Sequence, residues 1–242
     1  SYTEIMFGLK KNDRKYTIYS ISGLVKMENN IKECYQKQKE IAEEINELFP
    51  SVKKKNKNTF AIKEAVFPFN KFPEVDVLLG PEMKSTGEAM GFDNNFGLSF
   101  AKSQIASNNS IPLKGNAFIS VKDKDKDKIL NNAKKLVKFG FSLFATSGTA
   151  RYLVANGVRC KKVNKVSQGS PHIVEKLNQK NISLVINTTE GKDSIADSFS
   201  LRRTSLVNKV PYFTTIAAAN ACLESIGALK KDPIKVRALQ DN

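Results

Sequence analysis

The second half of the chain alternates between short apolar runs and amphipathic stretches, and this alternation constrains its fold more than any other feature. Short apolar runs bounded by turn residues favour strands, whereas apolar residues spaced three or four apart favour helices. Strands are predicted at 117–121, 141–145, 158–163, 183–186 and 212–215, and helices at 126–139, 149–155, 171–179, 194–207 and 217–229. Strands separated by helices are joined by crossovers and run parallel. We therefore expect an α/β domain in which a five-stranded parallel sheet has helices on both faces.

Two predicted helices indicate which side chains should be buried. The helix at 126–139 ends before Gly140, and its apolar side carries Ile129, Leu130, Ala133, Leu136 and Val137. A further helix is predicted at 96–106, with Phe96, Phe100 and Ile105 as its buried residues. Both expectations rest on helical spacing alone.

The residues before the α/β domain differ from it in character. The predicted pieces are a strand at 16–21, a helix at 30–49, a basic linker at 53–58 and, in a Pro-rich stretch, a strand with a following loop at 65–73. The chain is thus expected to divide into an unassigned N-terminal α+β segment, 1–60, a middle segment, 61–112, and the α/β domain, 113–242.

The charge balance is strongly basic, with 39 Lys and Arg against 24 Asp and Glu, a net charge of +15. Such a balance favours an anionic partner, or else reflects a lysine-rich solvated surface. The lysines lie mostly in mixed runs such as 122–128, where aspartates alternate with them, and aromatic residues are not interleaved to stack on bases. Nucleic acid is therefore an unlikely partner.

Three cysteines, Cys34, Cys160 and Cys222, lie far apart and share no ligand-like spacing. This argues against a disulfide framework or a zinc site, and it favours a cytoplasmic protein. No apolar run approaches the ~20 residues that a membrane helix needs, and no signal peptide opens the sequence. His172 is the single histidine, at the start of a predicted helix, where a packing or capping role is commoner than catalysis.

Polar residues follow the predicted strands where a parallel sheet binds its ligands. Hydroxyls, a glycine, lysines and the free N–H groups of a helix N-terminus together form an anion site. The candidate residues are Ser120 and Lys126 after the first strand, Thr146, Ser147, Gly148 and Thr149 after the second, Lys165 after the third, and Asn187, Thr188 and Thr189 after the fourth. The sequence contains neither a P-loop nor a G-x-G-x-x-G motif.

Two groups of residues resemble the large chain of carbamoyl phosphate synthetase. Residues 67–73, 78–88 (LLGPEMKSTGE) and 100–104 resemble the end of that chain's second ATP-grasp unit. From Gly115 onward the sequence is similar to its C-terminal domain, which has the methylglyoxal-synthase-like fold. The matching pieces are 119–121, 145–150, 163–166, 169–173, 186–191 and 202–203. The resemblance covers roughly 61–240, and the string 78–88 is long and unusual, which makes the match specific.

The resemblance implies a regulatory role. The family makes carbamoyl phosphate from bicarbonate, ATP and ammonia, which a glutaminase small subunit releases from glutamine, for pyrimidine and arginine biosynthesis. Its C-terminal domain binds nucleotide effectors such as UMP or IMP, and ornithine binds near the border with the synthetase unit. The family's phosphate site corresponds to Ser120, Lys126, Thr146, Thr149, Lys165, Asn187 and Thr189, while Ser147 stands where some relatives carry His. The implied partners are the nucleotide, the rest of the large chain and the small subunit.

Two departures from the family pattern limit what this chain is expected to do. Most of the ATP-grasp unit is missing before residue 61, and residues 1–60 resemble nothing in the family. ATP and Mg or Mn would serve the full-length synthetase, so no cofactor and no catalytic or metal-binding residue is expected in this fragment. We expect it to be inactive as a ligase on its own.

Two other functions fit parts of the sequence. A methylglyoxal synthase would share the fold and the phosphate site, but it needs an Asp base in a Gly-Gly-Asp-Gln segment. Here residues 167–171 read SQGSP, and Glu175 is the first carboxylate after them. A basic nucleic-acid-binding protein is the other alternative, and it rests on the charge alone.

Overall fold

The computed structural model describes residues 3–9, 18–25, 59–69, 84–190 and 198–236. The chain forms two compact units, one of residues 1–57 with 236–242 and one of residues 58–235. In the first, strands β1 (Thr3–Leu9) and β2 (Ile18–Val25) pair antiparallel. The strand predicted at 16–21 overlaps β2, whereas β1 was not predicted. The predicted helix at 30–49 and the linker at 53–58 lie outside the described residues.

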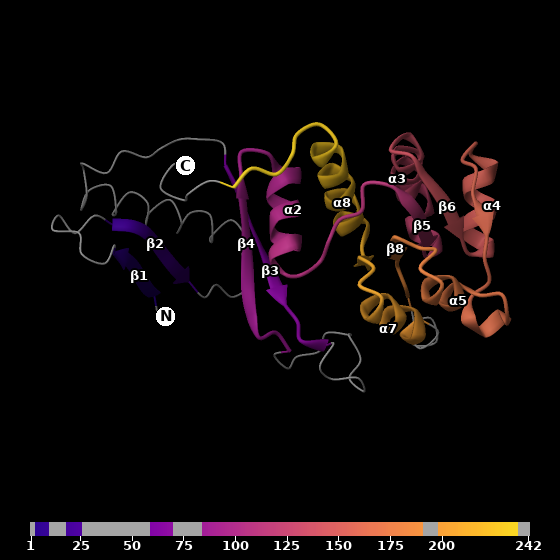
Figure 1. The fold of residues 1–242 in the computed structure, drawn as a ribbon, viewed down its shortest axis with the longest axis horizontal. Coiled ribbons are helices and arrows are strands. Elements are labelled where there is room, and N and C mark those ends of the chain that lie inside the picture. Colours follow the sequence, from indigo (N-terminus) through magenta and orange to yellow (C-terminus); the bar gives the residue numbers. More distant parts are fainter. Residues whose placement is uncertain (1–2, 10–17, 26–58, 70–83, 191–197, 237–242) are drawn as a thin grey trace. The chain divides into compact units, whose positions relative to one another are not determined.

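The second unit contains the predicted five-stranded parallel sheet, in the order β7-β6-β5-β8-β9 (Figure 1). Its strands are β5 (Gly115–Ser120), β6 (Phe141–Ala145), β7 (Lys161–Lys162), β8 (Leu184–Asn187) and β9 (Tyr212–Phe213). Its helices are α3 (Lys126–Lys138), α4 (Ser147–Ala155), α5 (Ile173–Asn178), α7 (Phe199–Val207) and α8 (Ile216–Leu229). The α/β class and the parallel sheet are confirmed.

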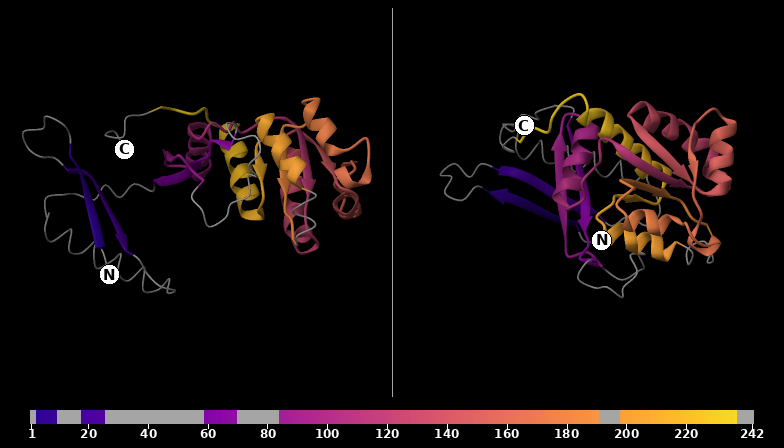
Figure 2. Two further views of the ribbon diagram at one scale, coloured as in Figure 1. Left: turned by 90° about the horizontal axis from the view of Figure 1, so that it is seen from below. Right: turned by 45° about the vertical axis from the view of Figure 1, so that its right-hand side comes forward.

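Two hydrophobic clusters lie on opposite faces of this sheet, because successive side chains of a strand point to opposite sides. Ala117 and Ile119 of β5 pack with α3, α4 and α8, whereas Phe118 packs with α5 and α7. The two views of Figure 2 show helices on either side of the strands. The sheet is therefore buried on both faces, as its nearly continuous apolar strands predict.

Several details of the prediction are wrong, and the fifth strand, Tyr212–Phe213, is shorter than the predicted 212–215. The third strand is only two residues long, Lys161–Lys162, instead of 158–163. Val137 is 46% exposed at the edge of the apolar face of α3, while Ile129 and Leu136 are fully buried. Ile105 is 52% exposed, because the buried face of its helix consists of smaller residues.

Two antiparallel strands with a helix packed on them precede the five-stranded sheet in the sequence. Strands β3 (Phe60–Val66) and β4 (Gly87–Asp93) pair in register, and helix α2 (Phe96–Ala106) contacts both of them and α8 (Figure 1). The helix agrees with the prediction, β3 begins earlier than expected, and β4 was not predicted. Since residues 58–235 form one unit, the proposed boundary at 112/113 is not a break in packing and stays a prediction.

Small residues allow α2 to lie close to its neighbours. The buried positions of α2 are Gly97, Ser99, Ala101, Ser103 and Gln104. The Ser225 hydroxyl of α8 donates to the Gly97 carbonyl at 2.8 Å, and the Ser99 hydroxyl donates to the Phe60 carbonyl at 2.8 Å. These bonds connect β3 to α2 and α2 to α8 of the sheet domain.

Candidate functional site

A cavity of about 680 Å³ opens at the carboxyl ends of β5, β6 and β8. Parallel strands end at one edge of a sheet, so side chains distant in sequence meet there. The cavity brings together all ten predicted residues, namely Ser120, Lys126, Thr146, Ser147, Gly148, Thr149, Lys165, Asn187, Thr188 and Thr189. The prediction of their proximity from strand ends is therefore confirmed, whereas their ligand stays a prediction.

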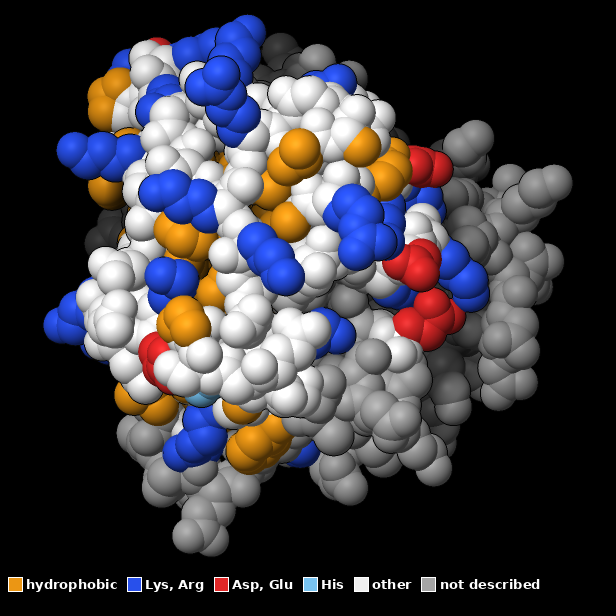
Figure 3. Space-filling view, turned by 90° about the vertical axis from the view of Figure 1, so that its right-hand side faces the viewer, with side chains coloured by type: hydrophobic (Ala, Val, Ile, Leu, Met, Phe, Trp, Pro, Cys, Tyr) orange, Lys and Arg blue, Asp and Glu red, His pale blue; other side chains and the backbone are white. Residues whose placement is uncertain are grey.

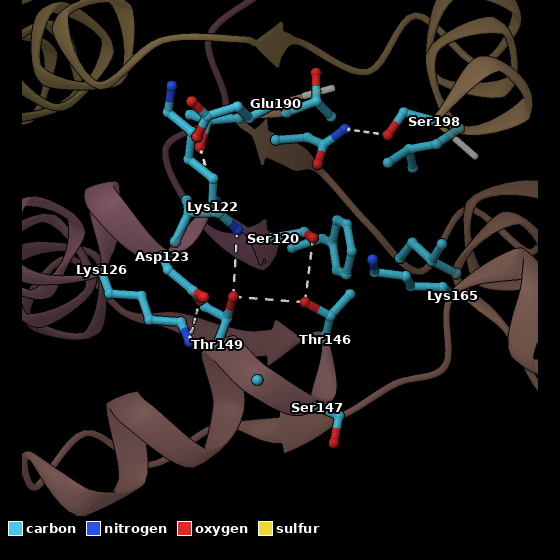
Figure 4. A pocket seen from close by; sticks show the side chains of 18 of the residues that line it. Ser120, Lys122, Asp123, Lys126, Thr146, Ser147, Thr149, Lys165, Glu190 and Ser198 are labelled. Atoms are coloured by element: carbon cyan, nitrogen blue, oxygen red, sulfur yellow. Dashed lines mark hydrogen bonds and ion pairs between the residues drawn. The ribbon is translucent and has the colours of Figure 1, made fainter. Parts of the chain in front are cut away.

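Three hydroxyls form the floor of the site (Figure 4). The Ser120 and Thr146 hydroxyls lie 3.1 Å apart, and the Thr146 hydroxyl lies 3.5 Å from that of Thr149. The Thr149 oxygen also accepts a bond from the Val121 N–H at 3.2 Å, and Thr149 is only 1% exposed. Thr149 therefore supports the loop after β5 as well as facing the cavity.

The N-terminus of α4 points into the same space. Thr146 is its N-cap residue but makes no side-chain capping bond, so the first N–H groups of the helix, from Ser147 onward, remain for a ligand. Gly148 is exposed, and a Cβ at this position would lie 3.7 Å from Lys126 Nζ. The side chain of Ser147 points away from the hydroxyl cluster in Figure 4, so this residue contributes backbone rather than hydroxyl to the cavity.

Lysines approach the hydroxyls from two sides. Lys126, at the start of α3, forms an ion pair with Asp123 at 2.6 Å, and this bond lowers the pKa of the Asp123 carboxyl. Lys165 comes from the loop after β7, on the opposite side of the cavity in Figure 4. An anion between them would meet positive charge from both directions, provided that Lys126 exchanges its carboxylate partner for the ligand.

A second ion pair lies at the rim. Lys124 Nζ is 3.0 Å from Glu190 Oε1, and the pKa of Glu190 is lowered first by this hydrogen bond and then by the nearby charges of Lys124 and Lys122. Both side chains are largely exposed, so the pair is screened by water and adds little to stability. Sequence reasoning missed these rim residues, because the alternating Lys-Asp run appeared to be a neutralised surface.

The cavity residues at the end of β8 form hydrogen bonds with other elements. The Asn187 amide donates to the Ser198 hydroxyl at 3.0 Å and to the Tyr212 hydroxyl at 2.7 Å. The Thr188 hydroxyl accepts a bond from the Lys122 N–H at 3.2 Å. These bonds fix the positions of both side chains, so Asn187 and Thr188 shape the cavity and hold its loops together.

Apolar side chains also line the cavity. They are Phe118, Val121, Val166, Ile173 and Leu201. They were assigned to the core from the sequence or were not singled out, since an apolar residue that lines a pocket has the same pattern as one buried in a core. Polar and apolar side chains in one cavity suit a ligand that carries an anion on an organic ring.

Some residues discussed above lie outside the cavity. His172 is the N-cap residue of α5, with Nε2 3.4 Å from Glu175 Oε1, and neither residue lines the cavity. Burial raises the pKa of the Cys160 thiol, and it raises that of Cys222 to about 12, which leaves both cysteines protonated and weakly nucleophilic at neutral pH. Among the described ranges, no three His, Cys, Asp or Glu side chains are grouped to hold a metal ion.

The surface of the α/β domain is basic but mixed. Figure 3 shows lysines and arginines scattered among neutral and hydrophobic side chains, without a continuous basic track on the face in view. Within the part of the chain that the structure describes, no helix is both long and apolar enough to cross a membrane.

Comparison with protein families matches residues 128–214 to the MGS-like domain. The large chain of carbamoyl phosphate synthase from Mesorhizobium japonicum is 50% identical over 187 residues, which cover 77% of this chain and 16% of that protein. The "C-terminal section" of the large chain from Methanopyrus kandleri is 47% identical over 204 residues, which cover 84% of this chain and 38% of that one. This chain thus spans well under half the length of these relatives.

A crystal structure of methylglyoxal synthase from Elizabethkingia anophelis NUHP1 covers 47% of this chain and 79% of its own, with 23% identity and a TM-score of 0.38. The assignment does not depend on this weak superposition, because the sequence matches and the parallel sheet already carry it. The chain contains an MGS-like domain and belongs, by sequence, with the C-terminal part of the large chain of carbamoyl phosphate synthase.

Proposed function

We propose that the cavity binds the phosphate of a nucleotide effector, UMP or IMP, and that its occupancy regulates a carbamoyl phosphate synthetase. The observation that supports this most is that three hydroxyls, two lysines and the N-terminus of α4 line one cavity, with Lys126 and Lys165 on opposite sides of it. Each charge-assisted bond to a phosphate contributes about 1.5–3 kcal/mol. A few of them supply the 1–3 kcal/mol typical of allosteric coupling.

The apolar side chains that line the cavity support a nucleotide rather than inorganic phosphate. Phe118, Ile173 and Leu201 would contact the base or ribose, while Lys126 and Lys165 face the phosphate. In this proposal the chain acts together with the rest of the large chain and a glutaminase small subunit. Ornithine is a second effector, and ATP with Mg or Mn serves the catalytic part of the full-length synthetase. The fragment itself needs no cofactor.

A thermal-shift screen against UMP, IMP, UTP and ornithine tests the proposal. A nucleotide at 100 times its dissociation constant should add about 2.7 kcal/mol to the free energy of unfolding. For a unit of this size, that gain raises the melting temperature by roughly 5–10 °C. Uridine at the same concentration is the control, and a shift as large with uridine as with UMP would argue against a phosphate site.

A methylglyoxal synthase activity is the second candidate, because the MGS-like domain and a phosphate site would serve it equally well. This activity needs a general base, and the carboxylates near the cavity are poorly placed to act as one. The carboxylates among the described lining residues are Asp123 and Glu190, and each is paired with a lysine. Glu175 is turned toward Ser170 and His172 instead. We expect no methylglyoxal from dihydroxyacetone phosphate in a colorimetric assay, and release that disappears in Asp123→Asn would reverse this conclusion.

A further inference from the structure

The loop that carries Lys165 and Gln168 to the cavity is anchored from outside by one carboxylate. Glu175 lies on α5 and accepts two bonds at Oε2, from the Ser170 hydroxyl at 3.1 Å and from the His172 N–H at 3.4 Å. Its other oxygen, Oε1, lies 3.4 Å from His172 Nε2. One side chain therefore holds both residues that flank Pro171.

Hydrogen bonds of backbone and side-chain groups also close the loop on itself. The Asn164 side-chain amide donates to the Gly169 carbonyl at 3.3 Å, and the Asn164 carbonyl accepts from the Ile173 N–H at 3.2 Å. The Gln168 side chain accepts from the Lys165 N–H at 3.0 Å. Asn164 thus holds the start of the loop, while Ser170 and His172 at its end are held by Glu175.

The surroundings of His172 increase the dependence on Glu175. Nδ1 of this ring is buried without a hydrogen-bond partner among the described residues. A proton on Nδ1 would therefore be buried and unpaired, so the neutral ring carries its proton on Nε2, facing the carboxylate. Without the carboxylate, the Ser170 hydroxyl, the His172 N–H and the His172 ring would all lose their acceptor.

We propose that Glu175 is a positioning residue for the phosphate site, acting through the loop that presents Lys165. This inference rests on the proposed nucleotide binding and extends it to a residue outside the cavity. Lys165 is exposed and has a long side chain, so the direction in which it reaches depends on where its backbone is held. A displacement of about 1 Å in such a support is enough to weaken a charge-assisted contact.

The variant Glu175→Gln tests this in the full chain. Glutamine keeps the size of the side chain but has one acceptor atom, so the three donors can no longer all be satisfied. We expect UMP affinity, measured by calorimetry, to fall roughly fivefold, the scale of one lost hydrogen bond. Glu224→Gln on the exposed face of α8 is the matched control and should bind UMP as the wild type does.

A double-mutant cycle separates positioning from a general loss of structure. If Glu175 acts through Lys165, then Glu175→Gln should change UMP affinity less than about twofold in a Lys165→Ala background. A full fivefold loss in that background, or unchanged affinity in the single variant, overturns the proposal. Should Glu175→Gln fail to fold, Ser170→Ala removes one of the three contacts at an exposed residue and is expected to weaken UMP binding in the same Lys165-dependent way.

Failure of the nucleotide-binding proposal can be distinguished from failure of the positioning role of Glu175. If neither UMP nor IMP binds the wild-type chain, the nucleotide site is wrong, and the role of Glu175 falls with it. If the wild type binds and Glu175→Gln binds equally well, the nucleotide site stands and only the positioning role is lost.

Discussion

Replacing Lys165 by alanine is expected to weaken UMP binding by roughly tenfold or more, the scale of one lost charge-assisted bond. Lys165 is exposed, and its backbone N–H and carbonyl both form hydrogen bonds with Gln168, so removing the side chain should leave the fold intact. Calorimetric titration of UMP into both proteins measures the effect. Uridine, which lacks the phosphate, should bind the two proteins equally.

Lys128→Ala is the matched control for charge. Lys128 is exposed on α3 and does not line the cavity, so its removal lowers the net charge equally without touching the site. UMP affinity should then change by less than about twofold at physiological ionic strength, because distant surface charges are screened. An equal loss in both variants would mean that UMP responds to the overall charge of the domain.

Thr149→Ala, in contrast, is not a clean test of ligand binding. The sequence alone predicts that the fold survives this change, because Thr149 is expected to face the ligand crevice. The structure shows that its hydroxyl accepts the Val121 N–H and is almost fully buried. Loss of that acceptor leaves a buried donor unpaired, at a cost of about 1–3 kcal/mol. A weaker binding in this variant would combine both effects.

Gly91→Val is expected to lower the melting temperature of the chain by roughly 6–12 °C, which corresponds to a loss of about 3 kcal/mol from overpacking. A Cβ at Gly91 would lie 2.0 Å from the Ser99 carbonyl oxygen and 2.4 Å from the Ser103 N atom. Both atoms belong to the backbone of α2, so this helix must move away from β4 to make room for the new side chain. Thermal melting followed by circular dichroism measures the loss.

Gly87→Val is the control for this change. Gly87 lies on the same strand four residues earlier, and thus on the same face, but a Cβ there has nothing within 4 Å. The same substitution at this exposed site should shift the free energy of unfolding by less than about 0.5 kcal/mol. Equal melting temperatures for the two variants would show that close packing of α2 on β4 does not contribute to stability.

The sheet domain was predictable because apolar residues have a different spacing in its strands than in its helices. Turn residues also mark where the elements end. The apolar run 141–145 became β6 with the same bounds, and Gly140 and Gly157 adopt positive φ where the preceding helices stop. The site followed from topology, since the ends of parallel strands meet. The sequence therefore predicted which residues come together without giving their hydrogen bonds.

The parts that could not be predicted depend on contacts between distant residues. β4 (GEAMGFD) lacks the β-branched residues typical of strands, and it is defined by pairing with β3 and by the close approach of α2 at Gly91. The exposure of Ile105 has the same origin, because the buried positions of α2 are Gly97, Ser99, Ala101, Ser103 and Gln104. The bonds of Glu175 to Ser170 and His172 depend on a loop conformation that has no signature in sequence.

Calorimetric titration of UMP, IMP and uridine into the wild-type chain tests the central claim most directly, since it measures whether a phosphate is recognised. We expect UMP or IMP to bind once per chain and uridine to bind at least tenfold more weakly, in proportion to the charge-assisted bonds that it cannot make. No heat from either nucleotide, or an affinity for uridine equal to that for UMP, would contradict it.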